Sequence, residues 1–194
     1  MQNKLTELNS EHQIWENIKG GDRDSLKQLY ELYYITLVNY GRKITGDQAL
    51  IEDAIQETYI SIWKYRVTMS VPASVKHYVL RAFRNRLAQI FKERPNITYT
   101  EESLSFSFEI GFDHKMIEGE DAQKLSAQIN KAVSKLTNRQ REIIYYRFYE
   151  NLSFEEIGEI MNMQIRATYK LNARAIASLR DILGTTLFNL FFLL

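Results

Sequence analysis

The amino-acid sequence predicts an all-α protein made of two small helical domains joined by a flexible acidic linker, with a helix-turn-helix in the second domain. Three observations lead to this prediction. Only two prolines and eight glycines interrupt the 194 residues, which leaves long stretches where helices can run unbroken. Apolar residues recur at steps of three and four on both sides of a central segment that lacks this period. That central segment is also acidic.

The composition is that of a globular protein, because 45% of the residues are hydrophobic and 12% are aromatic. Cysteine is absent, which excludes disulfides, thiolate metal cages and a cysteine nucleophile and fits a reducing compartment. The polar N-terminus, with Lys4, Glu7 and Glu11, contains no apolar run followed by a cleavage site. We therefore expect a cytoplasmic protein without a secretory signal.

The formal net charge of +1 is unevenly distributed along the chain. Residues 1–95 hold 14 Lys and Arg against 11 Asp and Glu, residues 96–120 hold 1 against 6, and residues 121–194 hold 10 against 7. Two mildly basic bodies therefore flank an acidic connector. Such a pattern is a weak indication of nucleic-acid binding unless the cations gather on one face.

Three helices are expected in the first domain. The first follows Gly20-Gly21-Asp22, is capped by Asp22 or Asp24, and has the apolar positions Leu26, Leu29, Tyr30, Tyr33, Leu37, Tyr40 and Ile44. The second follows Gly46-Asp47 and turns inward Ile51, Ala54, Ile55, Thr58, Tyr59 and Ile62. The third has Pro72 in its first turn and the apolar line Val75, Val79, Ala82, Phe83, Leu87, Ile90 and Phe91.

The outer faces of the last two of these helices carry opposite charges. The second helix turns outward Glu52, Asp53, Gln56 and Glu57. The third helix and its end carry one acid, Glu93, against the cations Lys76, Arg81, Arg84, Arg86, Lys92 and Arg94. A charged face is often no more than a solvated surface, so the pattern alone leaves both a binding role and a purely structural one open.

A linker is expected where the helical period disappears, between Pro95 and Glu120. So long a segment without secondary structure favours a domain boundary over an internal loop. We therefore expect a first domain over residues 1–95, a linker over 96–120, a second domain over 121–184 and an apolar tail over 185–194. Aromatic residues within the linker, such as Phe106 and Phe108, indicate that it docks somewhere.

The second domain is expected to open with a helix that turns inward Ala127, Ile129, Ala132, Val133 and Leu136. A capping box over residues 137–140 starts the next helix, which buries Ile143, Ile144 and Phe148. A second capping box over residues 153–156 starts a short helix with Ile157, Ile160 and Met161. The turn Asn162-Met163-Gln164 then leads into a longer helix, which completes a helix-turn-helix.

The helix-turn-helix has the residues that its packing requires. Gly158 supplies the small residue at the crossing of its two helices, Met163 fills the core at the turn, and Thr168, Leu171 and Ala175 form the inward line of the longer helix. The outward positions are Arg166, Tyr169, Lys170, Ala173 and Arg174. Because residues 164–180 hold four cations and no acid, this helix suits the major groove of DNA.

Two other classes of function compete with this prediction. An enzyme is disfavoured, because the chain has no Gly-rich phosphate loop, no nucleophile elbow and no His-Glu-x-x-His pair. We therefore expect no catalytic residue, metal, cofactor or small-molecule substrate. A conventional helix-turn-helix regulator, whose first domain senses a ligand or dimerises, stays open; it would bind its operator without RNA polymerase.

The run Ile51-Glu52-Asp53-Ala54-Ile55-Gln56-Glu57-Thr58-Tyr59-Ile60-Ser61-Ile62-Trp63 resembles the polymerase-binding helix of extracytoplasmic-function (ECF) sigma factors, particularly those of Bacteroides-like bacteria. The resemblance covers nearly the whole chain. It implies a non-catalytic subunit that binds core RNA polymerase and directs promoter-specific initiation. By this resemblance Asp53, Gln56, Glu57 and Ile60 bind the polymerase clamp, and Trp63 packs inward or beside that surface.

The same resemblance assigns promoter DNA to both domains. The segment His77–Leu87 is similar to the helix that melts and recognises the proximal promoter element, which implies DNA contacts by Lys76, His77, Arg81, Arg84 and Asn85. Residues 67–74 would capture a flipped base. For the distal element the implied contacts are Arg166, Ala167, Tyr169, Lys170, Ala173 and Arg174.

A membrane-bound anti-sigma factor is a further partner that the resemblance implies. The apolar tail, residues 187–194, is too short to span a bilayer, which takes about 20 apolar residues. It either folds back on the second domain as a helical extension or offers an apolar contact to an anti-sigma factor or to the polymerase.

Overall fold

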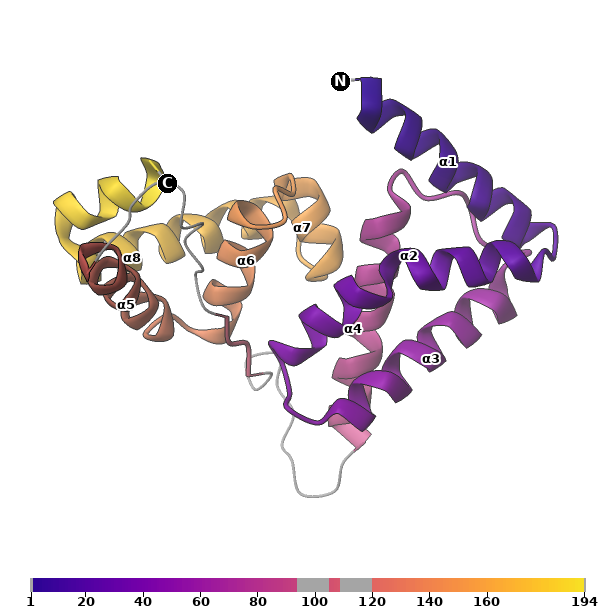
Figure 1. Cartoon of the computed structure of the whole chain (residues 1–194), viewed down its shortest axis with the longest axis horizontal. Helices are drawn as coiled ribbons and strands as arrows, with labels where there is room; N and C mark the ends of the chain where they lie inside the picture. Colours follow the sequence, from indigo (N-terminus) through magenta and orange to yellow (C-terminus); the bar gives the residue numbers. More distant parts are fainter. Residues whose placement is uncertain (1, 94–104, 109–119, 194) are drawn as a thin grey trace. The chain divides into compact units, whose positions relative to one another are not determined.

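The computed structural model describes the backbone of residues 2–93, 105–108 and 120–193 and the side chains of residues 10–93, 105–108 and 126–184. These parts contain helices and no strand, which confirms the predicted all-α class (Figure 1). The chain divides into two compact units, Met1–Tyr99 and Thr100–Leu194, called here the N-terminal and the C-terminal unit. Most of the predicted linker, residues 96–120, lies outside the described residues.

The N-terminal unit contains one more helix than the sequence predicted. Its helices are α1 (Gln2–Lys19), α2 (Arg23–Arg42), α3 (Gln48–Tyr65) and α4 (Val75–Glu93). The unpredicted helix α1 packs against α2 and α4, and it buries Trp15 and Ile18 near its end. Because the residues of α1 before Trp15 are mostly polar, the apolar period of this helix is too weak to indicate a helix from the sequence.

Helix α3 packs against both α2 and α4, which also contact each other. Asp22 is the cap of α2, since its carboxylate accepts hydrogen bonds from the backbone N–H groups of Asp24 and Ser25. Gly41 lets α2 approach α3 closely, because a Cβ at this position would lie 2.9 Å from Cγ2 of Ile51. The Tyr59 hydroxyl donates to the Leu29 carbonyl over 3.1 Å, which ties α3 to α2 in the core.

The start of α4 differs from the prediction. The helix begins at Val75, so Pro72 precedes it instead of occupying its first turn. Ser74 supplies the cap: its carbonyl accepts the Tyr78 N–H over 3.1 Å, and its hydroxyl accepts the His77 N–H over 3.4 Å. Residues 67–74 thus form a non-helical connection between α3 and α4.

The C-terminal unit contains α5 (Glu120–Ser134), α6 (Asn138–Phe148), α7 (Phe154–Ile160) and α8 (Ile165–Leu193). Helix α8 contacts the other three (Figure 1). Both predicted capping boxes are present, one between Thr137 and Gln140 and the other between Ser153 and Glu156. These caps fix where α6 and α7 begin.

The core of α6 was predicted only in part. Ile143 and Ile144 are buried as expected, but Phe148 is exposed and Tyr145 and Tyr146 are buried instead. Two Phe side chains of the predicted linker cover Tyr145. Phe106 and Phe108 are buried, and their ring centroids each lie 5.6 Å from that of Tyr145.

Residues 105–108 therefore dock on α6 by alternate side chains, since Ser105 and Ser107 are exposed. The Phe106 N–H also donates to Oδ1 of Asn138 over 3.3 Å. Burial raises the pKa of Tyr145, as does the hydrogen bond of its hydroxyl to Glu150, so this side chain is neutral at physiological pH.

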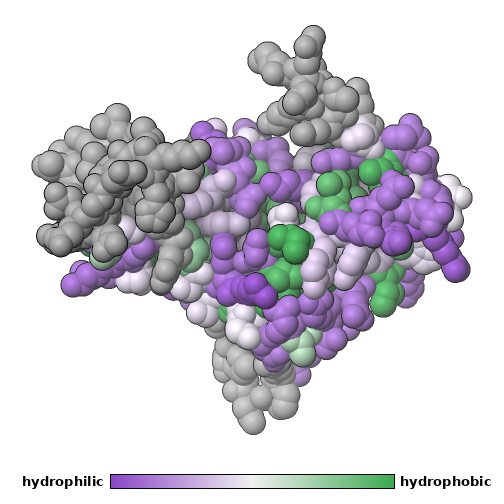
Figure 2. All heavy atoms as spheres, in the orientation of Figure 1, coloured by the Kyte–Doolittle hydropathy of each residue, from purple (hydrophilic) through white to green (hydrophobic). Residues whose placement is uncertain are grey.

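The end of α8 bends at Gly184, whose φ of 71° and ψ of 163° interrupt the helix. Helical backbone continues to Leu193, but the side chains of residues 185–194 lie outside the described ones, so both readings of the tail stay predictions. No helix among the described residues is long and apolar enough to cross a membrane. The face drawn in Figure 2 is mainly hydrophilic, with small separate apolar areas.

Candidate protein and nucleic-acid interfaces

The outer face of α3 is the first candidate interface. Asp53, Gln56 and Ile60 follow one another at steps of three and four residues and are all exposed, Ile60 at 64%. The opposite face of the helix holds Ala54 and Ile55, which are buried. The structure thus brings three of the predicted residues together as a surface of one acid, one amide and one apolar group.

Glu57 lies beside this face but already has a partner. Its carboxylate forms an ion pair with Nε of Arg86, which lies on α4. The pair links the acidic side of α3 to the basic side of α4. The sequence pattern placed both residues on charged surfaces, but nothing in it indicated that the two surfaces meet.

Trp63 occupies the edge of the α3 surface and is half-buried. The guanidinium of Arg66 lies 4.2 Å from the centroid of its ring, and Nη1 of Arg66 donates to the Trp63 carbonyl over 2.8 Å. Arg23, at the start of α2, lies 5.9 Å from the same ring. Trp63 is therefore partly packed and partly covered by cations.

Helix α4 presents four of its five predicted DNA contacts at the surface. Arg81 and Asn85 are exposed, and Lys76 and His77 are half-buried. These side chains sit at the start and on the outer side of the helix, directly after the connection formed by residues 67–74. That connection presents Val67, which is 72% exposed.

Arg84 does not lie on this surface. Its side chain is only 1% exposed, so the prediction that Arg84 contacts DNA is wrong for this structure. The reason is its position in the helical period, because Arg84 is four residues after Leu80 and three before Leu87, which are both buried. It therefore belongs to the inward line of α4, and the sequence spacing already contained this signal.

Helices α7 and α8 form the predicted helix-turn-helix. A Cβ at Gly158 would lie 3.0 Å from the Met163 carbonyl oxygen and 3.1 Å from Oγ1 of Thr168, so only glycine permits this crossing without a shift. The Met163 N–H donates to the Gly158 carbonyl over 2.8 Å. Met161 fills the core at the turn, whereas Met163, predicted for that role, is only half-buried.

The outer face of α8 carries every residue predicted for it. The six exposed side chains are Arg166, Ala167, Tyr169, Lys170, Ala173 and Arg174. Three of them, at intervals of four residues, form a single line of cations along the helix. Such a line suits the phosphates and base edges of a DNA groove.

Tyr169 joins this face to the rest of the unit. Its ring centroid lies 4.3 Å from that of Phe154, and the Arg147 guanidinium lies 4.9 Å from the Phe154 ring. This contact between tilted rings holds Tyr169 against α7 while leaving it half exposed. Among the side chains that the structure describes, no three His, Cys, Asp or Glu residues gather as a metal-binding group.

Comparisons with known families match both units. The family model "Sigma-70 region 2" matches residues 29–94, and the model "Sigma-70, region 4" matches residues 132–181. The first match contains α3 and α4, and the second contains α6, α7 and the part of α8 up to residue 181. Together the two segments include more than half of the chain.

Two similar proteins are both described as ECF RNA polymerase sigma factors. The "ECF RNA polymerase sigma factor SigW" of Bacillus subtilis is 23% identical over 157 residues, which are 77% of this chain and 84% of the relative. The "ECF RNA polymerase sigma factor BldN" of Streptomyces coelicolor is 25% identical over 88% of this chain, which spans 65% of that relative.

Two solved structures share the fold. CnrH, in complex with the cytosolic domain of CnrY, is similar with a TM-score of 0.59 and 16% identity, over 89% of this chain and 96% of that one. RpoE of Bartonella quintana, in complex with the anti-sigma factor NepR, has a TM-score of 0.54 and 20% identity, over 82% of this chain and 97% of that one. With both sigma regions in one chain and relatives of one kind, the chain belongs to the sigma-70 family, among its ECF sigma factors.

Proposed function

We propose that this chain uses the outer face of α3 to bind core RNA polymerase and the outer faces of α4 and α8 to recognise two promoter elements. It acts as an alternative sigma factor of the ECF type, which directs promoter-specific transcription initiation. Sigma factors are initiation factors and not enzymes. The observation that carries the proposal is the pairing, within one chain, of a sigma region 2 and a sigma region 4, each with an exposed charged surface.

The polymerase-binding surface centres on Asp53, Gln56 and Ile60. An interface core needs exposed apolar area, which Ile60 supplies, and polar groups that fix the orientation of the partner, which Asp53 and Gln56 supply. Glu57 and Trp63 lie at the edge of this surface, where each already contacts an arginine. We assign them a smaller share of the binding energy.

The proximal promoter element is recognised by the start of α4 and by residues 67–74. Lys76, Arg81 and Asn85 offer cations and an amide to a separated strand, and Arg84 is omitted because it is buried. The distal element is recognised by α8, where Arg166, Lys170 and Arg174 lie along one line. The cations supply affinity, and Tyr169 and Ala167 add contacts with base edges or methyl groups.

An anti-sigma factor is the proposed regulatory partner. CnrH and RpoE, which share the fold, were both solved with a protein partner, and that of RpoE is an anti-sigma factor. A membrane-bound protein of this kind would hold the chain inactive in the cytoplasm, where RNA polymerase works. The domain boundaries that we propose are 1–95 and 121–184, with a linker over 96–120 and a tail over 185–194.

Run-off transcription with purified core polymerase tests the proposal. The templates are a pool of genomic promoter fragments, each with its own barcode, and the variant is Asp53→Lys. We expect specific transcripts with the wild-type chain and a loss of at least about tenfold with the variant, because a reversed charge in an interface costs several kcal/mol. Core affinity, measured by fluorescence anisotropy, is expected to fall in parallel.

Glu31→Lys is the matched control. Glu31 is an exposed acid on α2 of the same unit, so its reversal changes the net charge equally without touching the α3 surface. We expect it to retain core binding and transcription. Tight DNA binding by the chain alone, together with no affinity for core polymerase, would reject the proposal in favour of a conventional helix-turn-helix regulator.

A further inference from the structure

Trp15 is the largest fully buried side chain that the structure describes, and the proposed promoter-binding surfaces do not explain its burial. It lies on α1, ahead of the segment that matches sigma region 2, which begins at residue 29. Its exposed fraction is 0%, although most residues around it on α1 are polar. Trp15 and Ile18 are the two buried side chains among the described residues of α1.

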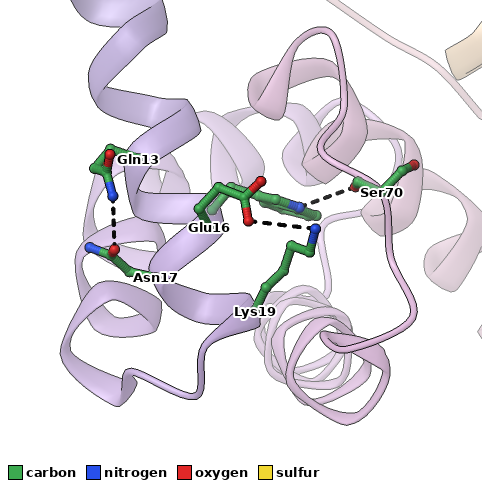
Figure 3. A network of polar contacts seen from close by, with 6 residues as sticks. Gln13, Glu16, Asn17, Lys19 and Ser70 are labelled. Atoms are coloured by element: carbon green, nitrogen blue, oxygen red, sulfur yellow. Dashed lines mark hydrogen bonds and ion pairs between the residues drawn. The ribbon is translucent and has the colours of Figure 1, made fainter.

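The Trp15 side chain contacts the connection between α3 and α4. Its indole Nε1 donates a hydrogen bond of 3.2 Å to the backbone carbonyl of Ser70 (Figure 3). The close-up labels Ser70 on this connection and marks the hydrogen bond by a dashed line, which joins α1 to the connection. An indole N–H can only donate a hydrogen bond, so the bond to Ser70 satisfies the full hydrogen-bonding capacity of the Trp15 side chain.

The ring of Trp15 also packs against Tyr78, which in turn contacts Met69, the residue before Ser70. Its centroid lies 4.9 Å from that of Tyr78 on α4, with an interplanar angle of 73°. The Tyr78 hydroxyl contacts Sδ of Met69 over 2.9 Å, within hydrogen-bonding distance. Trp15 and Tyr78 thus hold two consecutive residues, Met69 and Ser70, from the inner side of the connection.

The start of the connection is fixed separately, by the end of α3. The N–H groups of Thr68 and Met69 donate to the Tyr65 carbonyl over 3.0 and 3.2 Å. Beyond Met69 the backbone leaves this turn and passes Trp15. The outer side stays accessible, because Val67, Thr68, Ser70 and Ala73 are exposed.

We propose that Trp15 is a positioning residue for the recognition of the proximal promoter element. By fixing the Ser70 carbonyl and the Tyr78 ring, it holds residues 67–74 in the conformation that accepts an unstacked base. This inference rests on the proposed function, in which these residues face the separated strand. A pocket that discriminates between bases must be held within a fraction of an ångström, and an ordered support reduces the entropy lost on binding.

Trp15→Phe tests the inference, because it keeps an aromatic ring against Tyr78 and removes the N–H donor to Ser70. The assay is run-off transcription on a barcoded promoter library in which the proximal and distal elements are both randomised. We expect base preferences at the proximal positions to weaken by about fivefold, the factor that corresponds to the loss of one hydrogen bond. Preferences at the distal positions and the affinity for core polymerase are expected to stay unchanged.

Tyr59→Phe is the matched control. It also removes one hydrogen bond from a buried aromatic side chain to a backbone carbonyl, but this bond joins α3 to α2 and does not reach residues 67–74. If Trp15 only stabilises the fold, the two variants will behave alike at equal loss of thermal stability. Equal proximal preferences in the two variants would overturn the inference.

Tyr78→Phe keeps the test decisive if Trp15→Phe does not fold. It removes the hydroxyl that contacts Met69 and leaves the ring beside Trp15, so the inference expects a weaker proximal preference in this variant as well. Unchanged proximal preferences with Tyr78→Phe would overturn it. Failure of the proposed function has a different signature, because the wild-type chain would then give no promoter-specific transcript with core polymerase.

Discussion

Adding one methyl group at the crossing of the helix-turn-helix, by Gly158→Ala, is expected to destabilise the C-terminal unit. The new Cβ would lie 3.0 Å from the Met163 carbonyl oxygen, which belongs to the backbone, and 3.1 Å from Oγ1 of Thr168. The Thr168 side chain can turn away, although its hydroxyl now donates to the Gln164 carbonyl over 3.2 Å. The Met163 carbonyl moves only if the turn moves, so α7 and α8 must separate by a few tenths of an ångström.

The magnitude follows from two opposing effects. Overpacking at a close contact costs about 1–3 kcal/mol. Alanine returns up to about 1 kcal/mol, because its intrinsic helix propensity exceeds that of glycine. With overpacking at the middle of its range, about 2 kcal/mol, the net loss in the free energy of unfolding is about 1–2 kcal/mol, which lowers the unfolding midpoint of a small domain by about 4–16 °C. Separation of the helices also tilts the cationic face of α8.

Thermal unfolding followed by circular dichroism measures the effect, and Gly46→Ala is the control. A Cβ at Gly46 would meet no atom within 4 Å, so this variant is expected to change stability by less than about 0.5 kcal/mol. Affinity for distal-element DNA within the polymerase complex is the second readout, and we expect it to fall only for Gly158→Ala. A Gly158→Ala chain at least as stable as the Gly46→Ala chain would refute the close-contact argument.

Three further changes test other parts of the structure. Phe106→Ala is expected to lower the free energy of unfolding by about 3–5 kcal/mol, measured by urea titration, because it empties a site on α6; Ser107→Ala, on the exposed side of the same residues, should have almost no effect. Ser153→Ala removes the cap of α7 and should cost about 1 kcal/mol in the same measurement, whereas restoration by Ser153→Asp is expected if capping is the cause. Hydrogen bonds from the Ser25 hydroxyl and from the Asp24 N–H hold the pKa of the Asp22 carboxyl below its ordinary value. The charged carboxylate therefore stabilises the fold at every pH above that ordinary pKa, and this contribution is lost as the pH falls through the lowered pKa. Asp22→Asn should therefore unfold at a lower temperature than wild type near neutral pH, with the difference shrinking below about pH 4; a constant difference at every pH would contradict this assignment.

The sequence predicted those elements whose signals are local. Both capping boxes and the glycine at the helix crossing need only a few neighbouring residues, and the structure contains all of them. Arg84 could also have been placed correctly, because its spacing from Leu80 and Leu87 puts it on the buried line. Its charge outweighed its position in the prediction, although a long arginine can be buried where its charge is satisfied.

Other features depend on contacts between distant residues, which no local pattern contains. Trp15 contacts Ser70, 55 residues further along the chain. Helix α1 also has too few apolar residues for its helical period to be recognised in the sequence. The docking of Phe106 on Tyr145 is of the same kind: the aromatic residues of the linker indicated some contact, but not the helix that receives them. The pairing of Glu57 with Arg86 likewise follows from the packing of α3 on α4.

The docking of residues 105–108 on α6 limits how far the two units can separate. Twelve residue steps lead from Glu93, the last residue of α4, to Ser105, and a backbone of that length spans at most about 43 Å. Without the docking, the covalent path to the start of α5 at Glu120 has 27 steps and a limit of about 97 Å. The docking of two phenylalanines thus halves the longest possible chain path between the helices for which we propose contacts with the two promoter elements. Residues inserted between 94 and 104 would lengthen this path, whereas the same residues inserted between 109 and 119 would leave it unchanged.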